Sequence, residues 1–190
     1  MSKLLISLLT AAGIAFAGAA NAADKMMSRD AYRAEKDKIE TQYKTDKDHC
    51  SSMSGNAKDV CQKEAKGKEN IAKAELQAGY KPGAKSDAEV VKAKADAHYA
   101  VAKEKCDDMS GNQKDVCVKE AKAEHVKMKG DAKVMKVSDK TPEKRADARK
   151  DAREDTRDAQ YKVAVEKCDA MSGAAKDTCV KNAKTRYGKM

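Results

Sequence analysis

The chain has 190 residues, of which 40 are Lys or Arg and 31 are Asp or Glu, so its formal net charge at pH 7 is +9. Charged residues make up 37% of the sequence, whereas Phe occurs once and Trp not at all. A chain this poor in large apolar residues does not build a thick globular core, which excludes most enzyme folds that bury a sheet. The many Ala, Lys and Glu residues are strong helix formers, so we expect an all-α protein.

The first 22 residues have the three parts of a secretory signal peptide. Lys3 supplies the positive start, residues 4–17 form the apolar stretch, and residues 20–22 form a small-x-small cleavage site, Ala-Asn-Ala. We therefore expect cleavage after Ala22 and a periplasmic location. No later apolar run approaches the roughly 18 residues that a membrane span needs, so we expect no span in the mature chain.

A pattern containing two cysteines occurs three times after this segment. In each copy a Tyr stands seven residues before Cys-x-x-Met-Ser-Gly, and a second Cys follows the first by eleven residues. The copies begin at Tyr43, Tyr99 and Tyr161. Spacing of this kind is typical of tandem structural units. We expect units over residues 23–80, 81–138 and 139–190, the third with a charged lead-in helix.

Each unit has the pattern of an antiparallel helical hairpin. In the second unit, apolar residues recur at helical spacing on both sides of a short Ser-Gly-Asn segment. We expect Gly111 to end the first helix in a left-handed conformation and Asn112 to cap the second helix. The six expected helices cover residues 28–54, 57–78, 86–110, 113–137, 142–172 and 175–187. We expect an extended arrangement of the hairpins with little shared core.

The cysteines are expected to staple the hairpins. With the turn between Gly111 and Asn112, the two cysteines of a unit lie at equal height on facing helices, as a disulfide requires. The repeat selects the pairs Cys50–Cys61, Cys106–Cys117 and Cys168–Cys179. For helices with so thin an apolar stripe, a disulfide replaces part of the missing core.

The third unit departs from the pattern. Ala174 stands where the other units have Asn, and Thr178 stands where they have Val. Its second helix also has few residues available before the sequence ends. We therefore expect the third hairpin to be the least stable of the three.

The helix expected from Pro142 carries two rows of opposite charge. The rows are Arg145, Arg149, Arg153 and Arg157, and Asp147, Asp151 and Asp155. Residues four apart share a helix face, and the two rows fall on opposite faces. Like charges at this spacing destabilise a helix slightly. Two interpretations stay open: a solvated spacer helix, or a contact strip for an acidic partner or a neighbouring helix.

The sequence has no motif that predicts catalysis. It lacks Cys-x-x-Cys, a glycine-rich phosphate loop and His-Glu-x-x-His, and its three His residues do not follow the repeat. We therefore expect no enzymatic activity and no cofactor. If reduced, Cys50, Met53 and Cys61 would be soft ligands for copper, which makes a metal site the alternative to a disulfide.

The signal peptide and the segment Cys-Asp-x-Met-Ser-Gly-Asn-x-Lys-Asp-Val-Cys at 106–117 resemble small secreted proteins of Gram-negative bacteria. These are labelled TolA-like or cell envelope biogenesis proteins, and the resemblance implies an envelope location and no activity. We expect a non-enzymatic structural or interaction component of the envelope, whose partner is a protein or an anionic envelope component. The alternatives are a binding module for copper or anionic envelope polymers, and a periplasmic holdase. Because the charges are interspersed, we expect no specific nucleic-acid binding.

Overall fold

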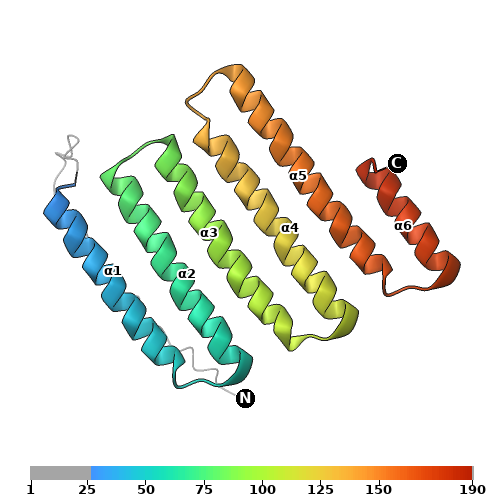
Figure 1. Ribbon diagram of the computed structural model, residues 1–190, viewed down its shortest axis with the longest axis horizontal. Helices are drawn as coiled ribbons and strands as arrows, with labels where there is room; N and C mark the ends of the chain where they lie inside the picture. Colours follow the sequence, from blue (N-terminus) through green and yellow to red (C-terminus); the bar gives the residue numbers. More distant parts are fainter. Residues whose placement is uncertain (1–26, 190) are drawn as a thin grey trace, which may run out of the picture.

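The described part of the chain forms six α-helices that lie side by side in a single layer, and successive helices run in opposite directions (Figure 1). The computed structural model describes residues 27–189, so the expected signal peptide lies outside the described residues. The helices are α1 (Arg29–Cys50), α2 (Gly55–Tyr80), α3 (Ala84–Lys105), α4 (Gly111–Lys136), α5 (Pro142–Cys168) and α6 (Gly173–Tyr187). Every substantial contact between α-helices joins two that are consecutive in the chain. The expected all-α fold of three helical hairpins is confirmed.

Three disulfides staple the hairpins at the end of the layer where their turns lie (Figure 1). The bonds are Cys50–Cys61, Cys106–Cys117 and Cys168–Cys179, with Cα separations of 5.6, 5.7 and 5.7 Å. The first cysteine of each pair is fully buried. The pairing expected from the repeat is therefore confirmed.

The turn within each hairpin differs from the expected one. After α3 the chain makes a single turn of 3-10 helix, η1 (Cys106–Asp108), and then runs extended through Met109 and Ser110. Gly111, with φ +56°, is the first residue of α4. The left-handed glycine therefore begins the second helix instead of ending the first, because the chain needs a positive φ to turn from the extended segment into α4. For the same reason the first helix of each hairpin ends about one turn earlier than the sequence suggested.

Asn112 is not the cap that the sequence suggested. Its side-chain Nδ2 donates a hydrogen bond to the backbone carbonyl of Glu166 in α5, at 3.0 Å. This bond joins the second hairpin to the third. Ala174 holds the equivalent place in α6, where no further helix follows in the described chain. Asn56, the equivalent residue of the first hairpin, makes no such bond, because its buried side-chain Nδ2 has no hydrogen-bond partner among the described residues.

Small residues let neighbouring hairpins pack closely. A Cβ atom built on Gly67 of α2 would lie 2.8 Å from the Cβ of Ala97 in α3, and one on Gly130 of α4 would lie 2.9 Å from the Cβ of Ala152 in α5. Neither site has room for a methyl group. The buried apolar residues are six alanines, Leu76 and three half-cystines. The seams between helices are therefore narrow but continue across hairpin boundaries.

On each outer edge of the layer, a polar residue stands where an inner helix has an apolar one. Thr41 of α1 is exposed at the repeat position where α3 has the half-buried Ala97, and Thr178 of α6 is exposed where α4 has the half-buried Val116. An end unit of a repeat array needs such a polar outer face because no neighbour covers it. Thr178 therefore differs from the Val of the other units because it lies on an uncovered face of α6 in the described chain.

The second helix of the third hairpin covers only part of the first. α5 has 27 residues and α6 has 15. Tyr187, the last residue of α6, lies beside Tyr161 of α5, with ring centroids 6.3 Å apart. The N-terminal part of α5 therefore has α4 on one side and, among residues 27–189, no helix on the other (Figure 1).

Candidate functional site: a groove lined by arginine

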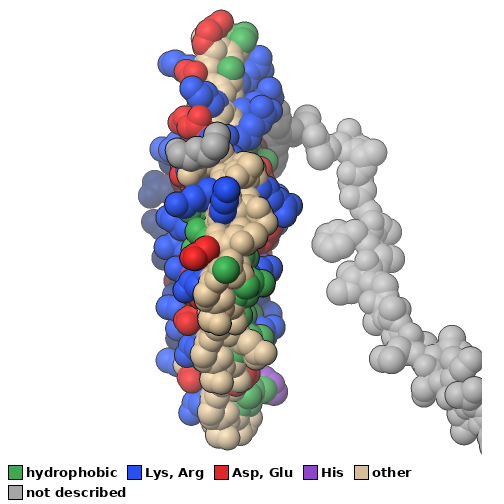
Figure 2. Space-filling view, turned by 90° about the vertical axis from the view of Figure 1, so that its right-hand side faces the viewer, with side chains coloured by type: hydrophobic (Ala, Val, Ile, Leu, Met, Phe, Trp, Pro, Cys, Tyr) green, Lys and Arg blue, Asp and Glu red, His purple; other side chains and the backbone are tan. Residues whose placement is uncertain are grey.

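A shallow groove of about 760 Å³ lies between α4 and α5. The polar lining includes Arg149, Arg153, Arg157, Lys127 and Asp131, and the apolar lining is Val134, Met135 and Ala152. The groove is open to solvent, and the Met135 side chain in it is 37% exposed. Seen from the α6 edge, the molecule is a narrow slab with Lys and Arg side chains along both flanks (Figure 2). The groove combines an apolar lining with a concentrated positive charge.

The arginine row is divided between two roles. Arg145 points to the preceding loop, where its guanidinium lies 3.5 Å from the carbonyl of Ser138. The other three arginines line the groove and are exposed. Within residues 27–189, no carboxylate oxygen lies within 4.0 Å of Arg149, Arg153 or Arg157. Three guanidinium groups thus face solvent without an ion-pair partner in the described chain.

The acidic row of α5 has a partial role within the fold. Asp155 accepts a hydrogen bond from Lys133 of α4 at 2.7 Å, whereas Asp147 and Asp151 are exposed. A second ion pair, Lys167–Glu120 at 2.7 Å, joins the same two helices. The interpretation of a contact strip for a neighbouring helix therefore describes Asp155. It does not describe the three groove arginines.

Comparison with the second hairpin shows what the arginines replace. Arg153 and Arg157 stand at the repeat positions of Val91 and Ala95 in α3, where Ala95 is fully buried. α4 runs the length of α3, whereas among the described residues α6 ends at Tyr187, beside Tyr161, and does not extend to Arg153 and Arg157.

A buried carboxylate in the first hairpin was not anticipated from the sequence. Glu69 is 6% exposed and accepts hydrogen bonds from Lys66 at 2.7 Å and Lys73 at 2.6 Å. Burial raises the pKa of Glu69, but the hydrogen bonds and charges of the two lysines outweigh it and hold the pKa below its ordinary value. The ammonium of Lys66 also lies 5.2 Å from the centre of the Tyr43 ring. Because both lysines engage it, this carboxylate has a structural role in the hairpin.

The second hairpin has a histidine at the equivalent position. His125 lies against the ring of Tyr99, with centroids 4.6 Å apart, and its Nε2 lies 2.6 Å from Asp96 Oδ1. Burial raises the pKa of Asp96, but hydrogen bonds from His125 and Lys92 and their charges bring it below its ordinary value. The third hairpin has Tyr187 in this place. The tyrosine of each repeat therefore packs against a different residue, so this layer carries no repeated chemistry.

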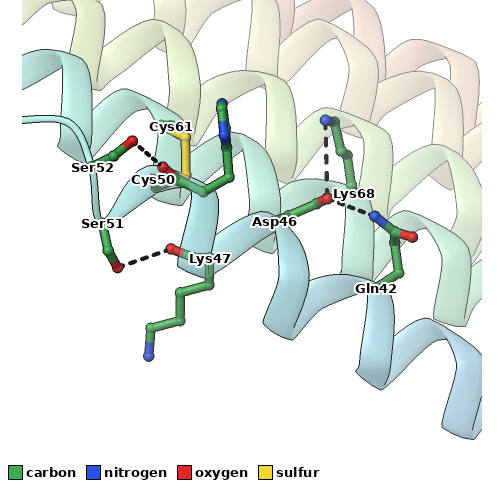
Figure 3. Close-up of a disulfide and its surroundings, with 9 residues drawn as sticks. Gln42, Asp46, Lys47, Cys50, Ser51, Ser52, Cys61 and Lys68 are labelled. Atoms are coloured by element: carbon green, nitrogen blue, oxygen red, sulfur yellow. Dashed lines mark hydrogen bonds and ion pairs between the residues drawn. A yellow bond between two sulfur atoms is a disulfide. The ribbon is translucent and has the colours of Figure 1, made fainter.

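The first disulfide closes the end of α1 (Figure 3). The hydroxyls of Ser51 and Ser52 donate to the backbone carbonyls of Lys47 and His49, at 3.2 and 2.8 Å, which satisfies acceptors left free in the last helical turn. Because Cys50 is bonded to Cys61, neither sulfur is a thiolate ligand in this oxidised form. Residues 27–189 contain no group of three or more His, Cys, Asp or Glu residues placed to hold a metal ion.

Two further observations bear on the class of protein. Among the described residues, no helix is both long enough and apolar enough to cross a membrane. Comparison of the chain with protein-family models, with curated proteins and with solved structures found no match. The candidate site therefore rests on its own geometry.

Proposed function

We propose that the protein is a non-enzymatic component of the bacterial cell envelope, a disulfide-stapled helical platform that acts by binding a partner. The observation that carries the proposal is the open groove between α4 and α5, with three unpaired arginines along an apolar lining. A solvated spacer would not need arginine at the positions of Arg153 and Arg157, which are apolar in the second hairpin. An open groove on one layer of helices suits a partner's surface better than it suits the enclosure of a small substrate.

The compartment is part of this proposal. Three disulfides in one chain favour an oxidising environment, such as the periplasm. The expected signal peptide and the resemblance to secreted envelope proteins favour the same location. In this form of the protein the cysteines stabilise the hairpins, which favours the platform over a copper-binding module.

Site-specific photo-crosslinking in intact cells tests the proposal. A photoreactive residue at Thr156, which lines the groove, is compared with one at Asp59, an exposed position on α2. We expect a discrete crosslinked product from Thr156 that is absent or much weaker from Asp59. If neither position, nor Val134 in the same groove, gives a product, the protein does not act by binding through this surface.

A further inference from the structure

We propose that the groove between α4 and α5 binds an acidic amphipathic helix from a partner protein. This inference rests on the proposed function and specifies the partner's chemistry. Carboxylates of the bound helix pair with Arg149, Arg153 and Arg157, and its apolar side chains cover Val134 and Met135.

The spacing of the arginines fits a helical partner. Arg149, Arg153 and Arg157 are four residues apart, so successive side chains rise by about 6 Å along α5. Carboxylates at every fourth position of a second helix have the same rise. A helix laid along the groove can therefore present a carboxylate at the height of each guanidinium group.

The groove also has the length and the lining that such a helix needs. Its α5 wall extends from Arg149 to Gln160, which corresponds to about 16 Å or three helical turns. Thr156 presents a small side chain between Arg153 and Arg157 in sequence, and the half-buried Ala152 lies at the floor of the groove, so no bulky side chain of α5 separates the arginines. Met135 is an adaptable apolar contact that is already 37% exposed.

Neighbouring helices of the protein itself pack through small residues flanked by ion pairs. α4 and α5 pack through the close contact of Gly130 with Ala152, and charged pairs lie beside it at Lys133–Asp155 and Lys167–Glu120. A helix in the groove would repeat this combination of small contacts and flanking ion pairs. The choice of arginine suits the site because a guanidinium holds a carboxylate through two parallel hydrogen bonds.

Other occupants fit less well. A small anionic ligand would stay largely exposed in an open groove. A flexible anionic polymer would be attracted by the arginines but would leave the apolar lining uncovered. The acidic helix uses both features.

A binding titration with the full oxidised chain tests this inference. The probe is a fluorescent helical peptide of about four turns with Glu at every fourth position and Leu beside the Glu row. We expect saturable binding that weakens at least about tenfold when Arg149→Gln, Arg153→Gln and Arg157→Gln are combined. Far-UV circular dichroism of the variant is the control for folding. We expect the wild-type spectrum, because the three arginine side chains are exposed.

A matched control removes three positive charges elsewhere. Lys122→Gln, Lys129→Gln and Lys136→Gln lie on α4, are exposed and do not line the groove. We expect this variant to bind the peptide as the wild type does, and a peptide with Gln in place of Glu to bind neither protein. Equal weakening in the control and the arginine variant would overturn the inference, because binding would then follow net charge alone.

Two further measurements distinguish the acidic helix from other anionic partners, and this inference from the proposed function. Arginine-dependent binding of inorganic polyphosphate or anionic phospholipid vesicles, without binding of the acidic peptide, would assign the groove to a different anionic partner and overturn the inference. If the wild-type protein does not bind the acidic peptide but Thr156 gives a crosslinked product in cells, the acidic helix is rejected and the proposed function is kept. Absence of both would reject the proposed function itself.

Discussion

The close approach of α2 and α3 gives a sharp prediction, because the same substitution should have opposite effects at two glycines of one helix. Gly67 and Gly79 both lie in α2. An added Cβ at Gly67 would lie 2.8 Å from Ala97 of the next hairpin, whereas one at Gly79 would have nothing within 4 Å. We expect Gly67→Ala to destabilise the protein and Gly79→Ala to stabilise it.

The magnitudes follow from two opposing effects. Replacing Gly by Ala inside a helix stabilises it by up to about 1 kcal/mol. Forcing a methyl group into a packed contact costs about 1–3 kcal/mol. Gly67→Ala should therefore change stability by between about 0 and −3 kcal/mol, and the two variants should differ by about 1–3 kcal/mol. Adding Ala97→Gly to Gly67→Ala moves the methyl group to the other helix and should recover most of the loss.

Urea unfolding of the oxidised protein, followed by far-UV circular dichroism, measures these differences. The difference between the two variants reports on contact between the first and second hairpins. If Gly67→Ala stabilises the protein as much as Gly79→Ala does, the first and second hairpins do not pack side by side.

Three other predictions concern the stability of the hairpins. Glu69→Gln should cost about 1–2 kcal/mol at neutral pH. Because the pKa of Glu69 is held below its ordinary value of 4.5, its ionised form stabilises the fold above that value, and this contribution is lost as the pH falls through the folded-state pKa. The difference in unfolding free energy between the wild type and Glu69→Gln, measured in urea, should therefore shrink in acid. A difference that does not change with pH would contradict this. Asn112→Ala should cost about 0.5–1.5 kcal/mol by removing a bond between hairpins, whereas Ala174→Asn should gain nothing in the same assay. Thermal unfolding of Cys106→Ser with Cys117→Ser should show a loss of about 2–3 kcal/mol, and an unchanged midpoint would show that the staple adds no stability.

The repeat made most of the fold predictable. The hairpin helices and the three disulfides follow from features that occur in every unit, namely the apolar spacing and the paired cysteines. The turn was harder to predict, because a glycine with positive φ can either end one helix or begin the next. The extended Met109 and Ser110 decide between these, and the sequence alone does not specify their conformation.

The packing between hairpins was not predictable from the repeat. Gly67 and Gly130 make equivalent kinds of contact but stand at different positions of their units, so the repeat does not reveal them. A glycine within a helix is unfavourable, and this was the available signal for a close approach.

The candidate site was predictable only in part. The sequence singled out the row that contains Arg149, Arg153 and Arg157, but their place in a groove depends on which side of α5 is covered by α4. It gave no signal for Glu69, because the other units have His125 and Tyr187 at that position.

Three disulfides join the helices of hairpins that bury only small apolar seams, and we propose that these bonds hold the fold together in the periplasm. The intact mass of native protein purified from the periplasm, before and after reduction, tests this claim most directly. We expect a chain that begins at Ala23, is lighter than its reduced formula by six hydrogen atoms for the three disulfides, and carries no metal. A mass equal to the reduced formula, with six reactive thiols or bound copper, would contradict the account and make the cysteines a binding site.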